Sequence, residues 1–349
     1  MMVKYYKKIF GMSGAPVHEI IIEESIKLLP EEIQQFLSEK IDGNKIPPIA
    51  TLDHHENWRI IKKLDTMSLS DLIIEGGRAE DQSYRAKKYY VDDRPMSSIF
   101  GVSVPSLTHY WCYELYKSVK KDVGLITVKN VKTPFWWVPG VNVIIEKILQ
   151  MLSKKNIPYQ SALSRALIYW EDDIFYYREK YNDPSHRAEI FLILGRILHL
   201  LTDIGVPAHI HCDTHIPYFD PDSYEFNVGF WMNEHKRIWK VRGDEQIFFN
   251  DKWESILLYF NRYAEISSLF DSDDVDGFGK GKPYRWPKKE RLGISGYLSQ
   301  SACKQIGNIL IPLAFRITAG IILLFFKIFF PSFWKDNRDK FLKNTTDQL

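Results

Sequence analysis

The chain has 349 residues, which is long enough for one large or two ordinary domains around a substantial buried core. A disordered tail protein and a peptide-sized scaffold are both excluded. Hydrophobic residues make up 45% of the chain and charged residues 26%, and 46 Lys and Arg residues against 44 Asp and Glu residues leave a net charge of +2. Net charge therefore gives no support to bulk attraction to nucleic acids or acidic surfaces.

A segment with three lysines, Lys4, Lys7 and Lys8, is followed by an apolar stretch, Ile9–Val17, that is broken by two glycines and a proline and is therefore a poor signal peptide. We expect residues 1–17 to form an N-terminal extension. Isoleucine and leucine then recur at helical spacing up to Pro30, and His18 stands one step earlier in the same stripe. The pattern predicts a helix whose first histidine faces inward.

Helical periodicity dominates the rest of the chain, with no internal repeat and no strand alternation beyond a short segment at 123–131. Further helices are predicted at 106–121, 141–153, 160–180, 184–204, 223–240, 249–268 and 297–330. This pattern favours an all-α fold, a single multi-helix bundle domain over residues 18–330. Glycine and proline cluster where we expect loops, at 76–77, 134–140, 205–221 and 271–282.

The apolar stretch 309–330 is long enough on paper to span a bilayer. It carries Arg316 and Lys327, however, and the helix between them reaches only about 15 Å against a hydrocarbon core of about 30 Å. We therefore expect a buried helix and no transmembrane helix. Pro331 ends this helix, and residues 331–349 are expected to form a frayed C-terminal tail.

The segment Ser185–His215 holds the most informative cluster of side chains. A helix that is apolar nearly all round carries His199 and Asp203, four residues apart and pointing the same way. A buried, ionised aspartate without a partner is strongly unfavourable, so a cationic group must meet it. Pro207 ends the helix, and further candidate ligands follow at His209, His211, Asp213 and His215.

The residues alone leave two interpretations of this cluster open. A single core histidine is usually satisfied by a backbone or side-chain partner. A His and an Asp at i and i+4 also have the geometry of a shared metal site, because imidazole nitrogen and carboxylate oxygen both bind zinc at about 2.0–2.2 Å. The further histidines close by favour the metal site.

Across Leu192–His209 the chain reads LILGRILHLLTDIGVPAH. This resembles the central signature YLG-x(3)-HYL-x-D-x(3)-P-x-H of the zinc-dependent phospholipases C of bacteria, whose fold is shared by fungal single-strand nucleases. Other family motifs are matched in the same order, namely an early inward histidine at His18, a G-x(2)-AxD-type turn at Gly77–Asp81, an aromatic-flanked histidine at His109 and a terminal helix motif at Arg316–Phe325. The matches span nearly the whole predicted domain.

The resemblance implies a multi-zinc cleft with two or three Zn²⁺ ions. Its first ion would be held by Asp81, His109, His199 and Asp203, with Asp203 bridging toward a neighbouring ion that His18 also binds. A second ion would be held by His209 and Glu225. Where the family has a further histidine ligand this chain has Pro221, and either Asp222 or His215 could replace it, Asp222 being slightly favoured because it is near Glu225 in sequence.

A second departure concerns the amino terminus. The family completes its His18-type site with the free amine and carbonyl of a processed tryptophan, but no tryptophan precedes Trp58 here. The nearest upstream aromatic in a comparable setting is Phe10. The third zinc would then be weak, absent or completed by water.

The resemblance implies a phosphodiester hydrolase, specifically a phospholipase C that cleaves glycerophospholipid to diacylglycerol and a phosphorylated head group. A zinc-bound hydroxide would attack phosphorus, and Asp81 would orient or deprotonate the water. The alternatives are a single-strand nuclease of the same fold and a non-catalytic helical zinc-binding protein. We expect a phospholipid or other phosphodiester substrate, transient contact with a membrane surface, no specific nucleic acid and a monomer; the family is typically secreted.

Four other features carry weaker predictions. His54 and His55 are adjacent and are expected to have a surface or local structural role. The cysteines, Cys112, Cys212 and Cys303, are too few and too widely spaced for a disulfide framework or a CxxC metal knuckle, and Cys212 is expected to be a packed thiol or else a zinc ligand. The segment 134–140 would pack in the core or meet a lipid interface, and 271–282 lacks the spacing of a calcium loop and is expected to be a solvated acidic turn.

Overall fold

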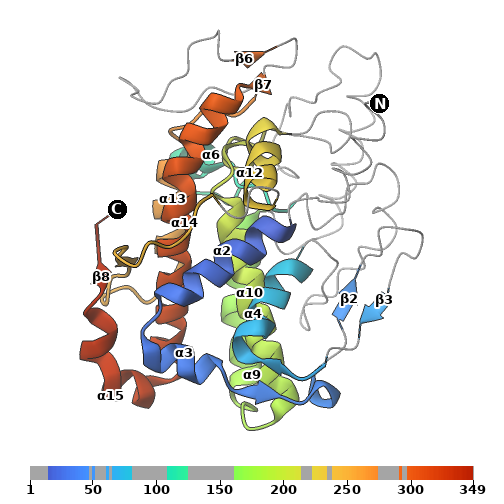
Figure 1. Ribbon diagram of the computed structural model, residues 1–349, viewed down its shortest axis with the longest axis vertical. Helices are drawn as coiled ribbons and strands as arrows, with labels where there is room; N and C mark the ends of the chain where they lie inside the picture. Colours follow the sequence, from blue (N-terminus) through green and yellow to red (C-terminus); the bar gives the residue numbers. More distant parts are fainter. Residues whose placement is uncertain are drawn as a thin grey trace.

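The computed structural model describes residues 15–46, 49–51, 60–62, 65–80, 108–124, 161–213, 222–233, 238–273, 291–292 and 297–348 (Figure 1). Over these ranges the fold is all-α, as predicted. The helices are α2 (Ala15–Leu28), α3 (Glu31–Leu37), α4 (Leu69–Ala79), α6 (Tyr113–Val119), α8 (Ala162–Ile168), α9 (Phe175–Arg178), α10 (Pro184–Asp203), α11 (Pro207–His211), α12 (Ser223–Asn233), α13 (Ile256–Ser267), α14 (Gln300–Phe329) and α15 (Pro331–Leu342). A π-helical turn, Tyr169–Ile174, joins α8 to α9, and a 3₁₀ turn lies at Gly43–Lys45.

Four short two-stranded sheets accompany the helices in these ranges. Three are antiparallel, pairing β1 (Lys40–Ile41) with β4 (Met67–Ser68), β2 (Ile49–Thr51) with β3 (Ile60–Lys62), and β6 (Arg291–Leu292) with β7 (Tyr297–Leu298). The fourth is parallel and pairs β5 (Ile247–Phe248) with β8 (Thr345–Thr346). The predicted helix at 141–153 lies outside the described residues.

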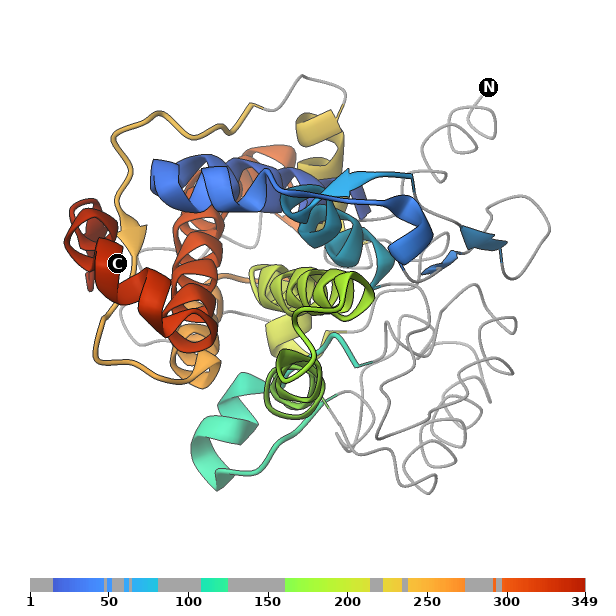
Figure 2. The same cartoon turned by 90° about the horizontal axis from the view of Figure 1, so that it is seen from below.

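Helix α10 is the centre of the bundle (Figure 2). It begins with Pro184 in its first turn, after Asp183, whose carboxylate accepts a hydrogen bond from the backbone N–H of Ser185 at 2.8 Å. Every residue from Ile190 to Asp203 is buried, because α2, α4, α8 and α14 pack around the helix. A sequence that is apolar nearly all round predicts such a central position.

Helices α4 and α10 approach so closely that only glycine fits at their crossing. A Cβ atom on Gly76 would lie 2.0 Å from the backbone oxygen of Leu192, and one on Gly195 would lie 1.9 Å from the backbone oxygen of Ile73. The predicted loop at 76–77 is therefore wrong, since both glycines lie inside α4. The sequence pattern is the same for a turn and for a close helix contact, and here the contact requires the missing side chain.

The buried helix predicted at 309–330 is confirmed as part of α14. By length and composition α14 could cross a membrane, but 83% of its most apolar window is buried inside the protein. Arg316 and Lys327, the two cations of the apolar stretch 309–330, bind backbone oxygens of neighbouring segments. Arg316 Nε donates to the backbone oxygen of Gln246 at 2.8 Å, and Lys327 Nζ donates to that of Trp253 at 3.2 Å.

The prediction of a frayed C-terminal tail is wrong for residues 331–346. Pro331 follows the end of α14, as predicted, but it also starts α15, in which Trp334 and Phe341 are buried against the core. Strand β8 then pairs with β5, with Thr346 opposite Phe248. The two aromatic side chains anchor an otherwise polar segment, which composition alone does not reveal.

We predict that Gly195→Ala lowers the free energy of unfolding by at least about 2 kcal/mol, because its methyl group would meet the backbone of α4 rather than a side chain that can move. Gly229→Ala is the matched control, since its added Cβ would meet only Val17 at 3.9 Å. That variant should be stabilised by about 0.5–1 kcal/mol. Denaturant unfolding of both variants would test this, and equal stabilities would contradict the tight crossing.

Candidate metal centre

Four histidines surround the carboxylate of Asp203. One lies on α10 with it, and the other three come from α2, from the segment 108–112 and from α11. His109 Nδ1 lies 2.8 Å from Asp203 Oδ2, and His199 Nε2 lies 3.3 Å from the same atom. His18 Nε2 and His209 Nδ1 lie 3.4 and 3.5 Å from Asp203 Oδ1. None of the five residues is more than 6% exposed. Only the first of these distances is that of a good hydrogen bond.

In two of the imidazoles, the outer nitrogen, which is the ring nitrogen facing away from Asp203, has a hydrogen-bond partner. His199 Nδ1 lies 2.7 Å from the carbonyl oxygen of Gly77, which can only accept, so Nδ1 carries the proton. The hydroxyl of Thr202 donates to the carbonyl oxygen of His199 at 2.8 Å. His18 Nδ1, 2.6 Å from that hydroxyl oxygen, must then also be the donor.

These hydrogen bonds fix which nitrogen faces Asp203. In a neutral imidazole whose Nδ1 is protonated, Nε2 carries the lone pair, and in both His18 and His199 it is Nε2 that points at the carboxylate. A lone pair beside an anion is repulsive, so the arrangement requires extra protons or a metal cation between the groups.

The donor atoms of His18, His199 and Asp203 fit a zinc ion. Their ligand atoms all lie within 4.8 Å of one another, and two imidazole nitrogens with a carboxylate oxygen are ligands that Zn²⁺ prefers. A histidine ligand typically donates its outer N–H to a carbonyl or hydroxyl oxygen, as both do here.

Asp203 is anionic despite complete burial. Burial by itself would raise the pKa of its carboxyl group, but His199, His109 and His18 together hold that pKa well below the usual range. Protons on these imidazoles or a metal cation between the groups would meet the expectation that positive charge compensates this aspartate.

A second charged layer lies behind His109. The carboxylate of Glu80, fully buried, lies 2.6 Å from Arg165 Nε and 3.0 Å from Arg196 Nη1. The hydroxyl of Tyr169 donates to it at 3.2 Å, and His109 Nε2 lies 4.0 Å away. One buried anion is thus held between two buried guanidinium groups.

The same arginines also form hydrogen bonds with residues next to the site in sequence. Arg165 Nη1 donates to Thr108 Oγ1 at 2.8 Å, and Arg196 Nη1 donates to the carbonyl oxygen of Ala79 at 3.0 Å. No motif in the sequence predicts this layer. The available signal is Arg196, a cation in an otherwise apolar helix, which has to meet a buried anion.

We predict that Glu80→Gln destabilises the protein by about 3–5 kcal/mol, because it removes the buried negative charge that lies 2.6 Å from Arg165 Nε and 3.0 Å from Arg196 Nη1. Glu265→Gln is the matched control, since its pair with Arg262 has the same 2.6 Å distance but is about half exposed. The control should cost no more than about 1 kcal/mol. Thermal and denaturant unfolding would compare the two, and similar losses would contradict the role of burial.

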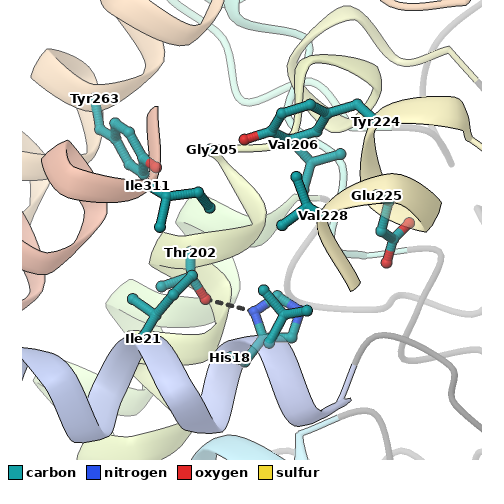
Figure 3. A pocket seen from close by; sticks show the side chains of 11 residues that line it. His18, Ile21, Thr202, Gly205, Val206, Tyr224, Glu225, Val228, Tyr263 and Ile311 are labelled. Atoms are coloured by element: carbon teal, nitrogen blue, oxygen red, sulfur yellow. Dashed lines mark hydrogen bonds between the residues drawn. The ribbon is translucent and has the colours of Figure 1, made fainter. Parts of the chain in front are cut away.

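The residues expected at the second zinc are only partly described. Glu225, on α12, lines the same pocket as His18 and Thr202 (Figure 3). Asp222 is buried and caps α12, because its Oδ1 accepts a hydrogen bond from the backbone N–H of Glu225 at 2.7 Å. Asp81, His215 and Pro221 lie outside the described residues, so the second zinc site stays a prediction.

The acidic loop expected at 271–282 is not solvated where the structure describes it. Asp271, Ser272 and Asp273 are all buried, and the hydroxyl of Ser272 donates to Asp213 at 2.6 Å. Asp273 Oδ2 accepts from the backbone N–H and the hydroxyl of Ser223, both at 2.9 Å. Asp273 therefore anchors the start of α12, and the three side chains are buried instead of facing water.

We predict that the stability of the protein depends on pH through Asp273. Burial, with a contribution from the nearby Asp213, raises the pKa of the Asp273 carboxyl group from 3.8 to about 7. The folded protein then binds a proton that the unfolded chain has lost, so stability is highest below pH 4 for this group and falls as the pH rises to about 7. With a chelator present, the free energy of unfolding of Asp273→Asn should vary less with pH than that of the wild type. An unchanged slope between pH 4 and 7 would contradict the assignment.

Cys112 and Cys212 form a disulfide, with their Cα atoms 5.4 Å apart. The prediction of a packed thiol or zinc ligand at Cys212 is therefore wrong. Residues 100 positions apart cannot be paired from spacing alone. Cys303 is a buried free thiol, and His54, His55 and the segment 134–140 lie outside the described residues.

Comparison with known proteins adds little beyond this geometry. No family model matches the chain, and no curated protein matches it in sequence. Among solved structures, the chain is similar to an alpha toxin from Clostridium absonum at a TM-score of 0.45 and 13% identity, covering 88% of this chain and 63% of the toxin. The chain thus spans less than two thirds of that protein, and a score this low does not establish a shared fold.

Proposed function

We propose that this chain is a zinc-dependent phosphodiester hydrolase of the phospholipase C type. One observation carries the proposal, namely that His18 and His199 both turn an imidazole lone pair toward the buried carboxylate of Asp203. A divalent cation turns this repulsion into coordination, and zinc in such a site polarises phosphoryl oxygens and lowers the pKa of a water ligand.

The chain's own residues supply the orientation. Gly77 and Thr202 hold the outer nitrogens of His199 and His18, so neither ring is free to rotate away from Asp203. Glu80 is fixed between two arginines, and Asp81, which follows it directly in sequence, is our candidate to orient or deprotonate the attacking water.

The substrate class rests on the motif resemblance described above, which favours a glycerophospholipid. The near-zero net charge supports this choice over a single-stranded nucleic acid, whose binding would call for a basic groove. We expect two or three zinc ions, with Asp203 between the first ion and the ion bound by His18, and with His209, Glu225 and Asp222 at the second.

We further propose that the protein works in an oxidising compartment. The disulfide between Cys112 and Cys212 supports this location, because such crosslinks persist outside the reducing cytosol. A labelled fusion followed by fractionation, with the thiol state of each fraction measured, would test it. Recovery of fully reduced protein in the cytosol alone would contradict the proposal.

We predict that His199→Gln lowers zinc affinity by at least about 100-fold and abolishes hydrolysis, because glutamine keeps a donor for Gly77 but lacks the imidazole nitrogen. His186→Ala is the matched control, a partly exposed histidine on the same helix about 20 Å away. Metal analysis of both purified variants and a chelator competition would give the result. Zinc content unchanged in His199→Gln would defeat the assigned role.

The substrate is decided by comparing phosphatidylcholine vesicles with single-stranded DNA as substrates for the zinc-loaded protein. Release of diacylglycerol and phosphocholine supports the phospholipase, whereas shortening of the DNA alone would replace it with a nuclease. Bound zinc without either activity would favour the non-catalytic zinc-binding protein. No bound zinc would overturn the metal centre itself.

A further inference from the structure

Two of the site histidines are not carried by long helices. His109 lies in the non-helical segment 108–112, and His209 lies in α11, which has only five residues. His18 and His199, by contrast, lie on α2 and α10, which have 14 and 20 residues. Helices as short as α11 are not stable by themselves, so the positions of His109 and His209 depend on tertiary contacts.

The disulfide joins these two segments close to both histidines. Cys112 follows His109 by three residues, and Cys212 follows His209 by three. The crosslink therefore lies at the same short distance along the chain from each imidazole. Both cysteines are buried, with Tyr110, in a small cluster apart from the main core.

Direct contacts between the segments surround the crosslink. The backbone N–H of Trp111 donates to the carbonyl oxygen of His209 at 3.0 Å, and the rings of Tyr110 and His209 lie 4.7 Å apart. The backbone N–H of Cys112 donates to the carbonyl oxygen of Val123 at 2.9 Å. Separation of the two segments would disrupt the first two of these contacts together.

The backbone at Cys212 is also held in an unfavourable conformation. Its φ of 50° and ψ of 37° place it in the left-handed region at the end of α11, which side-chain-bearing residues other than Asn and Asp rarely adopt. Such a conformation persists only when its surroundings fix it. The covalent bond to Cys112 and the hydrogen bond from the Cys212 backbone N–H to the carbonyl oxygen of Ala208 both contribute to that constraint.

We propose that the Cys112–Cys212 disulfide is a positioning crosslink that holds the imidazoles of His109 and His209 against Asp203, so that zinc affinity depends on its redox state. The inference rests on the proposed zinc site. Reduction by a dithiol would transfer two electrons and two protons, break the S–S bond to give two thiols and oxidise the dithiol to a disulfide. The reduced protein would keep His18, His199 and Asp203 on their helices and lose the fixed positions of the other two ligands.

The first test compares the wild type with Cys112→Ser/Cys212→Ser in a zinc titration against a chelating dye. We expect a 10- to 100-fold loss of zinc affinity, the range typical when the groups that orient metal ligands are removed. Cys303→Ala is the control, since its thiol lies on α14 and takes no part in the crosslink. A crosslink that serves stability alone would lower the melting temperature and leave zinc affinity at 25 °C unchanged, which would overturn the proposal.

A second measurement needs no variant. If the disulfide strengthens zinc binding, zinc must stabilise the disulfide by the same free energy. The midpoint potential of the Cys112–Cys212 pair in the wild type should therefore be about 30 to 60 mV more negative with zinc bound than without it, which is a 10- to 100-fold change for a two-electron couple. Equal potentials would overturn the proposal even if the serine variant fails to fold.

These outcomes separate the crosslink from the zinc site. Oxidised wild type that binds no zinc contradicts the proposed function. Oxidised wild type that binds zinc, with an affinity that does not depend on the crosslink and a midpoint potential that does not depend on zinc, contradicts only the positioning role. Cobalt substitution gives a further check, because the visible spectrum of bound Co²⁺ should change in the serine variant if ligands are lost and stay the same if they are not.

Discussion

The buried carboxylate of Asp203 is the constraint on which the rest of the site depends. A fully buried anion is tolerated only with cationic partners and well-placed hydrogen-bond donors, and this one lies at the end of the central helix. Its partners come from α2, from the segment 108–112 and from α11, as well as from α10 itself. Segments distant in sequence must therefore end at one point, and the bundle has to bring them there.

Charge alternates outward from that point. The imidazole of His109 lies between two anions, Asp203 and Glu80, and Glu80 in turn lies between Arg165 and Arg196. Each buried charge is thus offset by the next layer, which avoids the large penalty of an isolated ion. The same arginines bind the chain at Thr108 and Ala79, so the layer that compensates charge also fixes the segments that carry the ligands.

The sequence predicts features that depend on residues near one another in the chain, but it does not predict contacts between distant segments. Periodicity predicts α10 and α14 because their apolar residues repeat within each helix, and the i, i+4 spacing of His199 and Asp203 predicts a shared face. Only the motif resemblance, and not the spacing, predicts that His18 and His109 converge on that face. Nothing local distinguishes a glycine pair in a turn from Gly76 and Gly77 in a helix crossing, because the difference lies entirely in the partner helix.

The other differences between the predictions and the structure also arise from contacts between residues that are distant in sequence. The Cys112–Cys212 bond spans 100 residues, and the buried state of Asp273 depends on Ser223 and Leu298, which are remote from it along the chain. The polar composition of residues 331–349 predicts a frayed tail. Trp334 and Phe341 decide otherwise, since two large aromatic side chains that find a core outweigh many exposed polar ones.

One stripe of α10 ties the packing of the bundle to the chemistry of the site. Gly195, His199 and Asp203 follow one another at four-residue intervals and therefore lie on one face of the helix. Gly195 lets α4 approach, and that approach brings the carbonyl oxygen of Gly77 within 2.7 Å of His199 Nδ1. The hydrogen bond sets the tautomer of His199 and so the lone pair that faces Asp203. A missing side chain at the helix crossing thus determines which nitrogen is available to a metal one turn further along.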